Sequence, residues 1–141
     1  MSIAGLNVAW LSGIERSEIL PARNIGKKER TYYLASEVDL ARRKGLALDD
    51  VDVVITHDWP VGLGEGKGGE LIRSITEKLQ PQLHVCGHMH SFHQAVIGKT
   101  SVHALNAVPS AIMGEDRFGW WRLYEVTNGK IRGLSVGGNS F

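Results

Sequence analysis

The chain has 141 residues, of which 43% are apolar and 22% charged, and its formal net charge at pH 7 is +1. This length and composition fit one globular domain spanning residues 1–141, and the near-neutral charge excludes a strong long-range attraction to nucleic acid or membranes. The single cysteine excludes an internal disulfide framework and is typical of a reducing compartment.

The first third of the chain predicts one strand and one helix. Residues 6–14 (LNVAWLSGI) are typical of a strand that ends at Ser12-Gly13. Residues 36–39 (SEVD) resemble a capping box, which predicts a helix from there through Lys44. Basic side chains cluster at 23–30 and 42–44, where a solvated surface is the favoured interpretation and contact with a polyanionic substrate the alternative.

The middle of the chain predicts two short strands around a helix. Residues 51–57 (VDVVITH) form a nearly continuous β-branched run, which is typical of a strand buried on both faces. A glycine-rich loop at 62–69 follows, and residues 70–79 carry their apolar side chains on one helical face. Pro81 ends this helix, and residues 83–87 (LHVCG) predict a second buried strand.

The last third of the chain is rich in predicted strands. Residues 93–97, 101–107 and 120–126 are typical of antiparallel strands, and Thr127-Asn128-Gly129 predicts a hairpin turn into residues 130–136. The order of elements predicts an α/β domain, with a helix-covered sheet and a second sheet region. We find no long apolar membrane helix and no signal peptide, so we expect a cytoplasmic protein without a membrane partner.

Histidines follow two of the predicted buried strands. His57 lies in THDWP (56–60), and His88 and His90 lie in GHMH (87–90). Ligands bind beyond the carboxyl ends of strands in open α/β sheets, so we expect these imidazoles on one rim. In extended backbone His88 and His90 would face a common cavity, with Gly87 allowing a sharp turn. Metal ligation is the favoured role, and strand-end histidines hydrogen-bonded to backbone are the alternative.

The neighbouring polar residues have less specific roles. Asp58 would either hydrogen-bond a ligating histidine or cap its loop. Trp59 would shape that loop or stack on a base. We expect structural roles for His84 and His93, and a place in the core for Cys86.

The motif THDWP (56–60) followed by GHMH (87–90) resembles the C-terminal half of calcineurin-like metallophosphoesterases. LSGI (11–14) and ITHDWPVG (55–62) make the chain most similar to the branch that contains RNA lariat debranching enzymes, over about residues 5–110. The resemblance implies a partial layered αββα sandwich, with mixed sheets, flanking helices and missing N-terminal strands. Residues 1–141 would then be the C-terminal portion of such a domain.

The resemblance also implies metal-dependent hydrolysis of phosphomonoesters or phosphodiesters, including those of nucleic acid. It assigns His57 and His88 to one divalent ion (Mn, Fe or Zn) and His90 to a second, with His57 and His88 also catalytic. Two ions about 3.5–4 Å apart can hold a hydroxide between them and clamp the phosphoryl oxygens. Asp58 and Asn106 would lie beside the metal or substrate, with a turn or strand-pairing role as the alternative for Asn106.

Three motifs of that family are absent from the sequence. None of the six aspartates is followed two places later by histidine, Gly-Asp does not occur, and the single Gly-Asn precedes serine. Three imidazoles supply no negative charge to a pair of cations, so we expect at most a partial metal site and little or no hydrolysis by this chain alone. The alternative function is a non-catalytic binding or assembly module with a degenerate metal site.

Missing strands would also leave an unpaired apolar edge along residues 6–12 or 51–57. We expect self-association into a homo-oligomer, completion in trans by a separately encoded N-terminal half, or an artificially shortened gene model.

Overall fold

The computed structural model describes residues 1–15, 32–33, 36, 50–64, 68–108 and 118–137, and the statements below concern these residues. The basic cluster at 23–30 and residues 37–44 of the first predicted helix lie outside them. The helix predicted over residues 70–79 is confirmed as α2 (Glu70–Leu79). No helix in the described ranges is long and apolar enough to cross a membrane.

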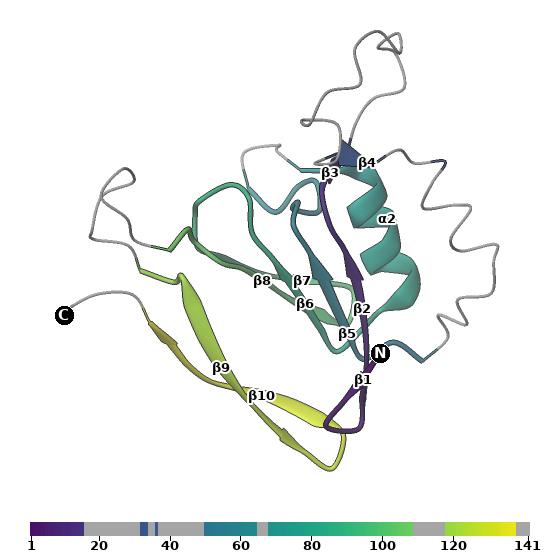
Figure 1. Ribbon diagram of the computed structural model, residues 1–141, viewed down its shortest axis with the longest axis vertical. Helices are drawn as coiled ribbons and strands as arrows, with labels where there is room; N and C mark the ends of the chain where they lie inside the picture. The colour runs from purple at the N-terminus through teal and green to yellow at the C-terminus, as the bar shows by residue number, and fades with distance from the viewer. Residues whose placement is uncertain (16–31, 34–35, 37–49, 65–67, 109–117, 138–141) are drawn as a thin grey trace, which may run out of the picture.

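The main sheet has six strands in the order β1-β2-β5-β6-β8-β7 (Figure 1). These strands are β1 (Ser2–Ile3), β2 (Leu6–Leu11), β5 (Val53–Thr56), β6 (Leu83–Cys86), β8 (Thr100–Ala104) and β7 (His93–Ile97). The four inner strands run parallel, and β1 and β7 pair antiparallel at the two edges. A separate short pair joins β3 (Ile14–Glu15) and β4 (Tyr32–Tyr33). The mixed sheet and its helix confirm the predicted α/β class.

The predicted C-terminal hairpin is confirmed as β9 (Trp121–Thr127) and β10 (Lys130–Gly137). Asn128 and Gly129 both have positive φ, 51° and 71°, which is the signature of the type I′ turn that Asn-Gly favours. Figure 1 draws this hairpin and α2 on different sides of the main sheet. The side-chain contacts agree with this view. Thr76 of α2 hydrogen-bonds to His84, and Tyr124 of β9 hydrogen-bonds to His103. The register of β6 and β8 places the side chains of His84 and His103 on opposite faces of the sheet.

The face of the main sheet beneath α2 is closely packed. Val54, His84 and Val102 are lateral neighbours in register, so their side chains share this face. Ile72 of α2 and Val102 are fully buried, and burial of each such side chain stabilises the fold by about 1.5–3 kcal/mol. Val102 belongs to a buried cluster with Trp59, Leu63, Cys86, Ile97 and Ala104. Cys86 is therefore the core residue that its position predicted.

The hairpin covers part of the opposite face. There Tyr124 and Ile131 pack on a cluster formed by Leu6, Val8, Val53 and Leu83. Further along the same strands, the paired residues Trp10 and Ile55 are 62% and 43% exposed. The prediction that residues 51–57 are buried on both faces is therefore wrong at Ile55, because the hairpin leaves the end of β5 uncovered.

The predicted open edge occurs at β2 rather than at β5. Strand β5 is internal, between β2 and β6. Strand β2 is bordered by β1, whose register pairs end at Asn7, and Val8 donates one further hydrogen bond to Met1 O at 2.7 Å. Among the described strands, none pairs with the outer edge of β2 beyond Val8.

The core histidine makes the fold sensitive to acid. His84 is completely buried, and burial lowers its pKa from 6.5 to about 4. Between these values the unfolded chain binds a proton that the native chain does not, so stability falls as the pH drops from 6.5 toward 4. We expect His84 to lower the free energy of unfolding by about 2 kcal/mol between pH 7 and about pH 4.5.

Urea denaturation at the two pH values measures this loss. The variant His84→Gln should reduce the pH dependence, whereas His90→Ala, at an exposed histidine, should retain it. The same pH dependence in His84→Gln and in the unmodified chain would contradict the assignment.

Candidate functional site

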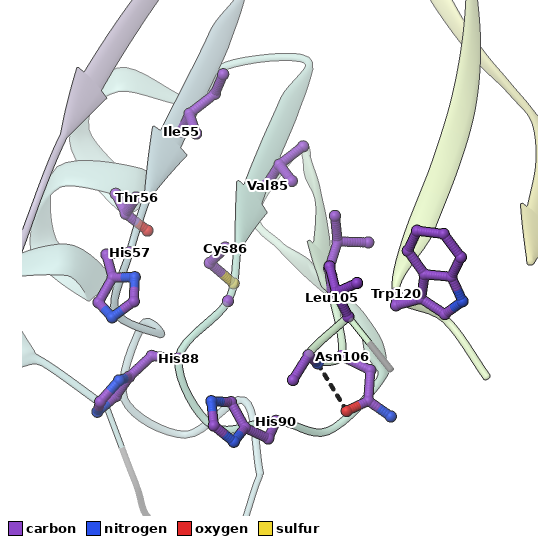
Figure 2. Close-up of a pocket in the computed structure, with 13 residues that line it drawn as sticks. Ile55, Thr56, His57, Val85, Cys86, His88, His90, Leu105, Asn106 and Trp120 are labelled. Carbon is purple, nitrogen blue, oxygen red and sulfur yellow. Dashed lines mark hydrogen bonds between the residues drawn. The ribbon is translucent and has the colours of Figure 1, made fainter. Parts of the chain in front are cut away.

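A pocket of about 390 Å³ opens at the carboxyl ends of the parallel strands. Figure 2 draws His57, His88 and His90 along one side of it, with the His90 ring turned toward the other two. The described residues that line it are Ile55, Thr56, His57, Val85, Cys86, Gly87, His88, His90, Leu105, Asn106, Ala107, Val108 and Trp120. The structure thus brings the three predicted ligands to one rim of the sheet.

His57 is held at this rim by the backbone on both sides. Its N–H donates to Leu11 O at 3.2 Å, and its carbonyl accepts the N–H of Gly87 at 3.2 Å. These bonds tie the ends of β2 and β6 to the residue that follows β5. The rings of His57 and His88 lie with their centroids 4.9 Å apart and their planes inclined by 53°.

The GHMH segment is a turn rather than extended backbone. His88 and His90 have positive φ angles of 67° and 50°, a conformation that side-chain-bearing residues seldom adopt, whereas φ at Gly87 is not positive. The N–H of Met89 donates to Gly87 O at 2.8 Å, and its side chain packs on the core. The extended geometry was therefore predicted wrongly, whereas the backbone does turn from Gly87 onward, without a positive φ at the glycine itself. Both histidines line the same pocket.

Asp58 is not among the described residues that line the pocket. It is 3% exposed, and its Oδ1 accepts the N–H of Trp59 at 2.8 Å, which favours the loop-capping alternative. Asn106 lines the pocket, while its amide donates to Phe118 O at 3.2 Å and its Oδ1 accepts the N–H of Ala107 at 2.8 Å. Trp59 is 3% exposed, which disfavours stacking on a base.

The pocket also has apolar walls that sequence reasoning did not identify. Ile55 and Val85 are neighbours in register on β5 and β6, and Leu105 and Trp120 lie across from them (Figure 2). The alternation of the two strands is the signal that would have placed Ile55 beside Val85. Trp120 could be predicted only to face away from Trp121, which is 36% exposed.

The donors at the pocket fit part of a metal site. His57 and His88 are close enough to serve as two ligands of one cation. Burial, together with the charge of Asp58, raises the pKa of the Cys86 thiol to about 12, so in the metal-free chain this thiol stays protonated at neutral pH. Among the described residues that line the pocket there is no aspartate or glutamate. Within the described ranges, no three His, Cys, Asp or Glu side chains form a ready metal-binding group.

No protein-family model matches the sequence, and no curated protein matches it at a significant level.

The positive φ angles at the pocket make glycine substitutions informative. A left-handed conformation costs an L-residue about 1–2 kcal/mol, and glycine avoids that strain. His90 is exposed, so its replacement removes little packing. We expect His90→Gly to unfold with a free energy about 1 kcal/mol higher than His90→Ala.

The matched control is the exposed His57, whose φ is not positive. There the order should reverse, with His57→Gly less stable than His57→Ala, because glycine gains more freedom on unfolding. Chemical denaturation of the four variants measures both differences, and the same order at both positions would refute left-handed strain at His90.

Proposed function

We propose that this chain is a metal-dependent phosphoesterase that acts on phosphomonoesters or phosphodiesters, those of nucleic acid included. The observation that carries the proposal is the approach of His57 and His88 to a ring separation of 4.9 Å in a pocket that His90 also lines. The substrate class rests on the resemblance of THDWP (56–60) and GHMH (87–90) to calcineurin-like metallophosphoesterases.

In this proposal the chain forms the C-terminal portion of a layered αββα sandwich. Two arrangements support such layering: α2 packs on one face of the main sheet, and the β9–β10 hairpin packs on the other. Trp10 and Ile55 remain exposed on the hairpin face of the sheet, which supports a sandwich whose second layer covers that face only in part.

His57 and His88 would hold one divalent ion (Mn, Fe or Zn) through neutral imidazole nitrogens, and His90 would serve a second. A bound ion acts as a Lewis acid and lowers the pKa of its water toward about 7. The chain's own contribution is to hold these imidazoles at one rim through the backbone bonds of His57. Because the described part of the pocket lining carries no carboxylate, we expect weak binding of a single ion and little or no hydrolysis by this chain alone.

Metal binding tests the proposal directly. Calorimetric titration with Zn²⁺ and with Mn²⁺ should detect no more than one ion per chain. His57→Ala and His88→Ala should each weaken metal binding at least about tenfold. Removing a residue that only hydrogen-bonds a metal ligand already costs about that much, and removing a ligand should cost no less. His93→Ala is the matched control, because His93 is absent from the pocket lining and its Nδ1 lies 2.6 Å from Phe92 O.

Hydrolysis of bis(p-nitrophenyl) phosphate with added Mn²⁺ provides the second measurement. Any turnover should fall in His90→Ala, and turnover that this variant leaves intact would remove His90 from the ligand set. Zn²⁺ affinity unchanged in both His57→Ala and His88→Ala would overturn the metal site itself.

A non-catalytic assembly module is the second candidate function. The observation that favours it is the apolar pair Trp10 and Ile55, 62% and 43% exposed beside the open edge of β2. Unpaired edges and exposed apolar surface favour association. With a net charge of +1, a second copy of the chain would meet little long-range repulsion.

Self-association is measured by sedimentation velocity over a wide concentration range. We expect the unmodified chain to form a dimer and Trp10→Ser to shift it toward monomer. Val96→Ser is the matched control, because Val96 is 70% exposed on β7, at the opposite edge of the sheet, and should leave the dimer intact. A monomer at all concentrations, with metal binding retained, would eliminate this candidate.

A further inference from the structure

A buried histidine connects helix α2 to the turn that carries His57. The Nε2 atom of His84 lies 2.8 Å from Thr56 Oγ1, and its Nδ1 atom lies 2.9 Å from Thr76 Oγ1. Thr56 ends β5 directly before His57, and Thr76 belongs to α2. His84 and Thr76 are 0% exposed and Thr56 is 5% exposed, so these contacts are shielded from bulk solvent.

Both threonine hydroxyls also meet carbonyl oxygens. Thr56 Oγ1 lies 2.6 Å from Asp58 O, and Thr76 Oγ1 lies 2.8 Å from Ile72 O. A carbonyl cannot donate, so each of these contacts needs the proton of the hydroxyl itself. If all four contacts were hydrogen bonds, both nitrogens of His84 would have to donate.

The protons of a neutral imidazole do not suffice for that arrangement. Burial lowers the pKa of His84 to about 4, so at pH 7 its ring carries one N–H. One N–H and two hydroxyls serve three of the four contacts. One contact must therefore go without a proton, and the cost of each omission decides which.

The contact to Ile72 O is the least costly to lose. Inside α2 this carbonyl still accepts the backbone N–H of the residue four places later. Asp58 is only 3% exposed and lies in a turn outside any helix or strand. The described hydrogen-bond donor to its carbonyl is the Thr56 hydroxyl. Leaving that buried carbonyl, or a ring nitrogen of the fully buried His84, unpaired costs about 1–3 kcal/mol. Thr76 therefore donates to Nδ1, and the ring proton resides on Nε2.

We propose that His84, as the Nε2–H tautomer, is a positioning residue for His57. Thr76 donates to Nδ1, Nε2 donates to Thr56, and Thr56 donates to Asp58 O. The three bonds are aligned from the helix toward the rim, and aligned hydrogen bonds strengthen one another. The last of them closes a turn whose middle residue is His57, which lies next to Thr56 at the pocket (Figure 2).

This chain of bonds gives the His57 turn a second anchor. The backbone of His57 is tied to the ends of β2 and β6, and the Thr56–Asp58 bond fixes the two residues that flank it. Losing that bond frees the turn without removing any predicted ligand. The role of His57 as a ligand rests on the proposed function, whereas the tautomer and the turn do not.

The tautomer is measured first, by long-range ¹H–¹⁵N correlation spectra of the metal-free chain at pH 7. We expect the Nε2–H form at His84. The Nδ1–H form would overturn the proposal, because Nε2 would then carry no proton to donate to Thr56.

The positioning effect is measured with threonine variants. Thr56→Val keeps the shape of the side chain and removes the hydroxyl, and Thr56→Ser keeps the hydroxyl. We expect Thr56→Val to change the ring chemical shifts of His57 and to weaken Zn²⁺ binding about tenfold, with Thr56→Ser restoring both. Thr100→Val is the matched control, because Thr100 is 0% exposed and its hydroxyl has no hydrogen-bond partner among the described residues.

A fourth variant separates positioning from general loss of stability. Thr76→Val removes the donor to Nδ1 but leaves the Nε2–Thr56–Asp58 link, so it should lower the unfolding free energy without changing the His57 shifts. If Thr76→Val and Thr56→Val change those shifts equally, the proposal is overturned. If the unmodified chain binds no Zn²⁺, the proposed function fails, and the metal-free shifts still decide the role of His84.

Discussion

The parallel alignment of β2, β5, β6 and β8 is the constraint on which the rest of the structure depends. Because these strands run in one direction, the segments that leave their carboxyl ends begin at one rim. His57 and His88 meet there although a loop, a helix and a strand separate them in the sequence. Two backbone hydrogen bonds, from His57 N–H to Leu11 O and from Gly87 N–H to His57 O, extend the parallel pairing beyond the ends of β5 and β6.

The two faces of this sheet are closed to different degrees. Beneath α2 the packing is complete enough to bury His84 fully, with threonine hydroxyls as its partners. On the other face the hairpin stops short of the rim, and Ile55 is exposed there as a pocket wall. The pocket therefore has an ordered core behind it and an incompletely covered surface in front.

Local pattern predicted most elements but not their environment. The hairpin turn is determined by Asn128 and Gly129 themselves, and the strand over residues 93–97 has the predicted bounds. The exposure of Ile55 depends on the position of a hairpin far along the chain, which β-branched composition does not encode. The His57–His88 approach was predictable from strand ends, whereas the left-handed GHMH backbone was not, because histidine seldom adopts it.

The left-handed conformation of His88 and His90 affects how any ligand would meet them. The backbone of this turn is already committed to a sparsely populated shape in the folded chain. The entropy of ordering it is therefore lost during folding rather than during association, so a bound group would need to restrict few further degrees of freedom. Weak metal affinity at this rim would then result from the shortage of negatively charged ligands, and not from disorder of the imidazoles.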